Sequence, residues 1–158
     1  MKQKDGLKHY GSLMMKPNYQ TPFDWIIESE WDNVSFVAPA ELPWEYHDLP
    51  KLGINYCCYD IDPVYSDYEY YRICDPIFDP VDLAHFIVNF NAQKMYPIGK
   101  LYKGEFIIVG SDIAHNGDCN IITSCEQLIE QNMLHTVFDK KSIVTNRCTY
   151  HFVWGRND

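Results

Sequence analysis

Apolar residues recur along the chain in two patterns, which predict different secondary structure. Short runs that alternate or are wholly apolar, bounded by Gly, Pro, Asn or Asp, are typical of β-strands. Apolar residues at helical spacing are typical of a helix with one buried face. The first pattern predicts strands at residues 25–27, 34–38, 53–59, 68–74, 104–109, 119–123, 135–138, 142–145 and 148–154. The second predicts helices near residues 80–94 and 124–133.

The helix expected over residues 80–94 has a start signal as well as a periodic face. Asp79 is a suitable cap, and Pro80 suits the first helical position. Four large apolar residues then recur at helical spacing, namely Leu83, Phe86, Ile87 and Phe90. The second helix starts at a capping box formed by Thr123 and Glu126.

The connections favour antiparallel pairing. Residues 60–66 are predicted to form a hairpin loop, while residues 139–141 and 146–147 are predicted to form turns. Helices are too few for regular α/β alternation. We therefore expect an α+β fold, with a mainly antiparallel or mixed sheet of about six to eight strands and two helices on one face.

The length of 158 residues predicts one folded domain. Residues 1–22 are polar and contain Pro17 and Pro22, so we interpret them as an N-terminal arm that precedes a domain at residues 23–158. No apolar run approaches the length of a membrane span, and the N-terminus lacks the apolar run of a signal peptide. The six cysteines are interpreted as reduced thiols, so we predict a cytoplasmic protein.

The net charge of −9 is concentrated in one part of the chain. Residues 24–82 contain fourteen Asp and Glu but only Lys51 and Arg72 as bases. A negative field of this kind repels the phosphates of nucleic acid and attracts basic partners. The charge therefore argues against direct binding of nucleic acid and favours a basic protein partner.

Carboxylates alternate with tyrosines between Tyr59 and Asp82, which suggests a binding surface. Tyrosine gives a large contact area with few torsions, and it is enriched at interfaces. The main functional hypothesis is an acidic binding or inhibitory protein, either a nucleic-acid mimic or an immunity-type inhibitor. Its candidate partner-binding residues are Asp60, Asp62, Asp67, Glu69, Asp75, Tyr65, Tyr68 and Tyr71. The alternative is structural, because the same pattern fits a half-buried strand followed by Asp-Pro turns.

A second hypothesis is a small hydrolase or nucleotide-processing enzyme. Asp112, His115 and Asp118 follow an apolar strand, where His115 could act as a base or all three could hold a metal ion. The alternative is a hairpin with Asn116-Gly117 at its tip. We place no metal site and no cofactor in the chain, because it has no Gly-rich phosphate loop and no EF-hand register. A structural protein without a site is the third hypothesis, and the oligomeric state stays open.

Overall fold

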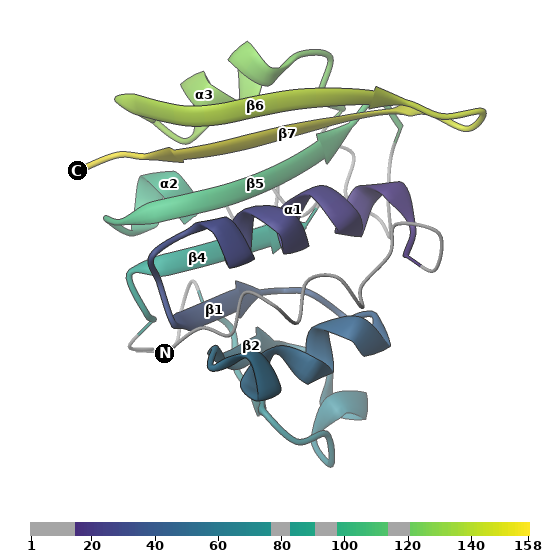
Figure 1. Ribbon diagram of the computed structural model, residues 1–158, viewed down its shortest axis with the longest axis vertical. Helices are drawn as coiled ribbons and strands as arrows, with labels where there is room; N and C mark the ends of the chain where they lie inside the picture. Colours follow the sequence, from purple (N-terminus) through teal and green to yellow (C-terminus); the bar gives the residue numbers. More distant parts are fainter. Residues whose placement is uncertain (1–14, 77–82, 91–97, 114–120) are drawn as a thin grey trace.

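A seven-stranded sheet runs through the centre of the computed structural model (Figure 1). The structure describes residues 15–76, 83–90, 98–113 and 121–158. The strand order is β3-β2-β1-β4-β5-β7-β6. The strands are β1 (Asn33–Val37), β2 (Asn55–Asp60), β3 (Tyr71–Ile73), β4 (Phe86–Phe90), β5 (Glu105–Ser111), β6 (Thr136–Val144) and β7 (Thr149–Arg156).

Most neighbouring strands are parallel. β3, β2, β1, β4 and β5 all run in one direction, and only β7 runs against its neighbours β5 and β6. The sheet is mostly parallel, so the predicted α+β fold with a mainly antiparallel or mixed sheet is wrong. The residues between β2 and β3 do not form the predicted hairpin loop, because a hairpin joins antiparallel strands and this pair is parallel.

Helical segments cover both faces of the sheet. On one face, α1 (Pro17–Glu28) and the 3-10 helix η2 (Trp44–Leu52) pack on a core that includes Phe36 and Phe90. On the other face, α2 (Ile98–Leu101) and α3 (Cys125–Gln131) pack on a core that includes Phe106. A second 3-10 helix, η3 (Pro63–Tyr65), follows β2. The expectation of two helices on one face is corrected to an α/β arrangement of three layers.

β5 shows how one strand serves both cores. Its side chains alternate, so Ile107 and Val109 join the core under α1 while Phe106 and Ile108 join the core under α3. Each of these four residues has no exposed surface. Burying a side chain of this size stabilises the fold by roughly 1.5–3 kcal/mol, which explains why the run is apolar at every position.

Two predicted elements have the wrong type. Residues 86–90, expected within a helix, form the central strand β4 with all five residues buried. A wholly buried strand is apolar on both faces, and such a run can also match helical spacing. Conversely, residues 25–27, expected as a strand, lie in α1, where all three side chains are buried. That helix includes residues 17–22, which the sequence pattern assigns to the arm.

Several elements are close to their predictions. Strands expected at residues 34–38, 53–59, 104–109 and 148–154 are present as β1, β2, β5 and β7. The two strands expected at residues 135–138 and 142–145 form one long strand, β6, so the turn predicted at residues 139–141 is wrong.

The helix expected at residues 124–133 is confirmed as α3, with its cap shifted by one residue. Ser124, not Thr123, accepts the backbone N–H of Gln127. Residues 121–123 are not in a strand, and residues 119 and 120 lie outside the described part. No helix in the described part of the chain has the length and apolar character needed to span a membrane.

Candidate functional site

The carboxyl ends of five parallel strands meet at one edge of the sheet, called here the carboxyl edge. The arrowheads of β1, β4 and β5 point to this side in Figure 1. The chain adds β2 and β3 on one side of β1 and then returns to add β4 and β5 on the other. Open α/β sheets bind ligands in the crevice outside the carboxyl ends, at the point where the strand order reverses. Here that point lies between β1 and β4.

The loop that follows β1 has an unusual backbone conformation at this point. Ala38 and Ala40 adopt left-handed φ angles of 52° and 53°. The loop continues to Pro43 and contains no glycine. A left-handed alanine is disfavoured by roughly 1–2 kcal/mol, so other contacts must hold the turn.

Asp60, the last residue of β2, supplies one of these contacts. Its carboxylate accepts the backbone N–H of Ala40 at 2.8 Å and that of Asp62 at 3.1 Å. The side chain is buried, with 7% of its surface exposed. An ionised carboxylate has about four acceptor positions, so about two remain for a ligand.

Tyr71, the first residue of β3, holds the loop from the other side. Its hydroxyl donates to the Ala40 carbonyl at 2.7 Å and accepts the backbone N–H of Leu42 at 3.1 Å. Burial raises the pKa of Tyr71, so the hydroxyl keeps its proton and its role as donor at neutral pH. Side chains from β2 and β3 thus fix the loop after β1.

A cavity of about 680 Å³ lies further along this edge, beside the turn that joins β6 to β7. The start of α1 and this turn line it, with residues Lys16, Pro17, Asn18, Tyr19, Thr145, Asn146, Arg147 and Tyr150. The Tyr19 ring packs edgewise on Phe90, the last residue of β4, at 5.2 Å between centroids. The cavity therefore lies next to β4. Among the described residues that line it, two are cations and none is a carboxylate.

The predicted partner-binding residues gather around β2, η3 and β3, but they play different roles. Asp60 binds the loop after β1 through the backbone N–H of Ala40. Asp62 caps η3 by accepting the Val64 N–H at 3.0 Å. Asp67 and Glu69 are exposed, and Asp75 follows β3. The rings of Tyr65, Tyr68 and Tyr71 form a cluster with centroid separations of 5.2 to 5.3 Å.

The predicted catalytic trio is described only in part. Asp112 follows β5 and accepts the backbone N–H of Thr149 at 2.9 Å, which ties β7 to the end of β5. His115 and Asp118 lie outside the described residues. Within the described ranges, no group of three or more His, Cys, Asp or Glu side chains is arranged to hold a metal ion.

Sequence reasoning missed the loop after β1 and the cavity beside α1. A usable signal for the loop was a short run of small residues between two apolar strands, with an acid at the end of the second strand. That spacing is typical of a nucleotide-binding β-α-β unit, in which the acid binds the ribose. The loop contains no glycine, so this signal was not recognised. No pattern in the sequence indicates that Tyr19 and Tyr150 line the same cavity.

Comparison with known proteins agrees with this topology. The sequence matches no protein-family model and no curated protein. The structure is similar to Burkholderia thailandensis 1,6-didemethyltoxoflavin-N1-methyltransferase with bound S-adenosylhomocysteine, with a TM-score of 0.59 and 13% identity over 96% of this chain and 85% of that one. It is also similar to M. capricolum TrmK in complex with S-adenosylhomocysteine, with a TM-score of 0.62 and 8% identity over 92% of this chain and 70% of that one. TehB from Haemophilus influenzae gives a TM-score of 0.60 and 12% identity over 99% of this chain and 68% of that one.

The chain therefore shares with these structures a Rossmann-like α/β fold with a mostly parallel seven-stranded sheet. This corrects two sequence-based hypotheses, because neighbours with this fold point away from an acidic inhibitor and away from a hydrolase. A basic protein partner and a cytoplasmic location stay predictions.

Proposed function

We propose that the chain binds S-adenosylmethionine at its carboxyl edge and acts as a methyltransferase. The observation that carries this proposal is the position of Asp60. Its carboxylate ends β2 beside the switch point, touches the loop after β1 and keeps free acceptor positions. Two of the structural neighbours hold S-adenosylhomocysteine, the product form of the same cofactor.

The residues present fit the ribose end of this cofactor. Two hydroxyl donors of a ribose need acceptors, and Asp60 has about two acceptor positions left. Ala38 and Ala40 adopt the left-handed backbone angles that glycines adopt in other nucleotide-binding loops. Each alanine adds a Cβ where a glycine has only hydrogen, so we expect weaker binding than a Gly-rich loop gives.

When bound, S-adenosylmethionine supplies an electrophilic methyl group on a sulfonium centre. The chain's own contribution is to bind and orient. Asp60 receives the ribose, and the cavity between α1 and the β6–β7 turn receives the methyl acceptor. Lys16 and Arg147 line that cavity, and no described residue of its lining is a carboxylate, which favours a small acceptor that carries negative charge.

Isothermal titration with S-adenosylhomocysteine tests the binding step. We expect saturable one-to-one binding by the wild-type protein. Asp60→Asn should weaken it by about tenfold or more, because ribose hydroxyls then lose a charged acceptor. Asp67→Asn is the matched control, since Asp67 is an exposed carboxylate in the same stretch, and its affinity should equal the wild-type value.

Absence of binding by the wild-type protein at millimolar ligand would overturn the proposal. So would an unchanged affinity in Asp60→Asn, provided that the variant melts as a folded protein. The methyl-transfer step is tested by supplying S-adenosylmethionine with a panel of small acids and matched neutral compounds. We expect S-adenosylhomocysteine to accumulate with an acid and to accumulate more slowly in Arg147→Gln.

A further inference from the structure

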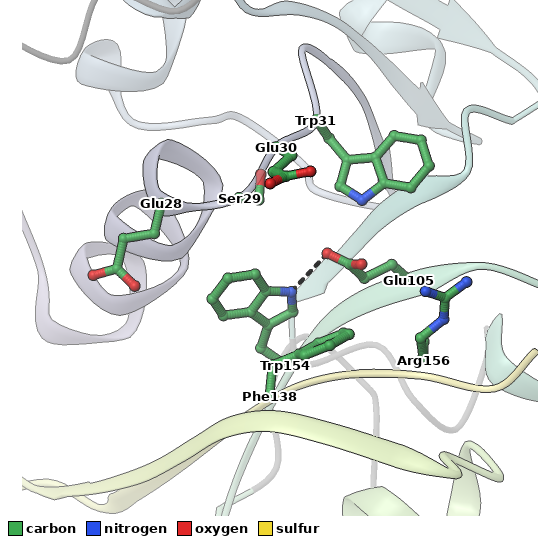
Figure 2. Close-up of a pocket in the computed structure, with 8 residues that line it drawn as sticks. All are labelled: Glu28, Ser29, Glu30, Trp31, Glu105, Phe138, Trp154 and Arg156. Atoms are coloured by element: carbon green, nitrogen blue, oxygen red, sulfur yellow. Dashed lines mark hydrogen bonds between the residues drawn. The ribbon is translucent and has the colours of Figure 1, made fainter.

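A second cavity, of about 510 Å³, lies at the opposite edge of the sheet (Figure 2). Its lining combines the end of α1, the segment that follows it, and residues near the start of β5 and β6 and near the end of β7. The residues are Glu28, Ser29, Glu30, Trp31, Glu105, Phe138, Trp154 and Arg156. Because β5 begins here, this is the amino edge, away from the site proposed for the cofactor.

Aromatic rings form the walls of this cavity. Figure 2 shows Trp31 on one side of the Glu105 carboxylate and Trp154 on the other. Trp31 stacks on Phe86 at 6.3 Å, and Trp154 packs on Phe138 at 5.5 Å. Phe138 has 46% of its surface exposed, so this wall is open to an entering ligand.

The cavity also carries an excess of negative charge. Glu28, Glu30 and Glu105 contribute three carboxylates, while Arg156 is the one cation among the described lining residues. The Arg156 guanidinium is paired with Asp158 at 2.6 Å. Among the described residues, none of the three glutamates forms an ion pair within 4.0 Å.

Glu105 is the most deeply placed of these carboxylates. Only 8% of its surface is exposed, and its Oε2 accepts the indole N–H of Trp154 at 2.9 Å. A buried carboxylate is costly unless a positive charge or several donors compensate it. Here one indole donor and the nearby Arg156 guanidinium, which is itself paired with Asp158, compensate Glu105 only partly. The carboxylate points into the space between the two indoles (Figure 2).

We propose that this cavity binds a small organic ammonium ion. Indole and phenyl faces attract ammonium groups through their quadrupoles, and Trp is the strongest of the aromatic side chains in this role. The Glu105 carboxylate would supply the counter-charge between the rings, and Glu28 and Glu30 would attract the ligand from solvent. A volume of about 510 Å³ lies within the range of small-molecule sites.

Titration with choline and with n-butylammonium tests the proposal. Binding is measured by calorimetry and by the change in intrinsic tryptophan fluorescence, to which Trp31 and Trp154 contribute. Dimethylbutanol, the neutral carbon isostere of choline, is the matched ligand control. We expect at least one of the two cations to bind with one-to-one stoichiometry. If choline binds, we expect dimethylbutanol to bind at least about tenfold more weakly than choline. Choline alone binding indicates a quaternary ligand, and n-butylammonium alone indicates a primary amine. No binding by either cation, or equal binding of choline and dimethylbutanol, overturns the proposal.

Variants locate the site. Glu105→Gln keeps an acceptor for Trp154 but removes the charge, and it should weaken cation binding by about tenfold or more. Phe138→Leu should weaken it by about two- to fivefold through loss of one ring. Glu69→Gln removes an exposed carboxylate elsewhere and should leave the affinity unchanged.

An unchanged affinity in a folded Glu105→Gln protein would overturn the assignment. If that variant fails to fold, the exposed Glu30→Gln decides, because the proposal requires it to bind the cation more weakly than wild type. S-adenosylhomocysteine binding should be the same in all of these variants. The cation site can therefore fail without affecting the proposed cofactor site.

Discussion

The carboxylates at the two edges of the sheet differ in the hydrogen bonds and ion pairs that they form within the protein. At the carboxyl edge, Asp60 accepts two backbone N–H groups and shares the fixing of one loop with Tyr71. At the amino edge, Glu105 receives a single indole donor, and Glu28 and Glu30 form no ion pair within the described part of the chain. A carboxylate that accepts hydrogen bonds from backbone N–H groups stabilises the fold and keeps only some of its acceptor positions for a ligand. A carboxylate with few hydrogen bonds or ion pairs inside the protein contributes little to stability, and its charge can interact with a bound ligand.

Replacement of Asp60 should give the largest loss of stability in this comparison. Asp60→Ala leaves the amides of Ala40 and Asp62 without their acceptor and releases a strained turn. We expect a decrease of about 3 kcal/mol in the free energy of unfolding, measured by urea denaturation. Glu30→Ala is the matched change at the amino edge and should alter stability by no more than about 0.5 kcal/mol. Equal losses in the two variants would contradict the difference between the edges.

Tyr71→Phe should have the next largest effect, because it removes one hydroxyl that makes two hydrogen bonds to the same loop. We expect a loss of about 1–2 kcal/mol near neutral pH. Burial raises the pKa of Tyr71 in the folded protein, so its contribution is complete below the unfolded value of about 10 and is lost as pH rises further. The stability difference between wild type and variant should therefore be constant from pH 6 to about pH 9 and become smaller above about pH 10.

Urea denaturation of both proteins across this pH range measures that difference. Tyr70→Phe serves as the control, since Tyr70 is exposed in the same segment and its loss should change little at any pH. A difference that stays constant up to pH 11 would contradict the role given to the Tyr71 hydroxyl.

Local sequence predicted some strands well and others poorly, for one physical reason. β5 and β7 are apolar runs with clear ends, and their β-strand type was evident. β4 was misassigned because Phe86, Ile87 and Phe90 match helical spacing, yet its polar residue Asn89 does not lie on an exposed face. Asn89 is in fact fully buried, and its side-chain amide donates to the Val37 carbonyl on the neighbouring strand. Residues 86–90 form a strand because they pair with strands that are distant in the sequence, and a short segment of sequence does not contain that information.

The parallel direction of strand pairing was also not predictable from the local sequence. A polar loop between two strand patterns predicts a hairpin, but β2 and β3 are parallel and joined by a short 3-10 helix. The candidate site was predictable only in part for the same reason. Asp60 was selected because of its charge, but its neighbours Ala38 and Ala40 were not, since left-handed turns are normally signalled by glycine. Only the folded loop shows that these alanines adopt that conformation.

Ala40→Gly gives the smallest expected change in stability and the most direct test of what the loop is for. Glycine removes a left-handed penalty of roughly 1–2 kcal/mol but gains conformational freedom in the unfolded chain, so a net stabilisation of about 0.5 kcal/mol is expected. Ala84→Gly, at a residue outside the left-handed region, should instead destabilise by roughly 0.4–1 kcal/mol, because glycine only adds freedom to the unfolded chain. If the loop faces a nucleoside, removal of the Ala40 Cβ should also strengthen S-adenosylhomocysteine binding by several-fold. Stabilisation without tighter binding would mean that Asp60 and Tyr71 hold this loop for the fold alone, and the cofactor proposal would lose its structural basis.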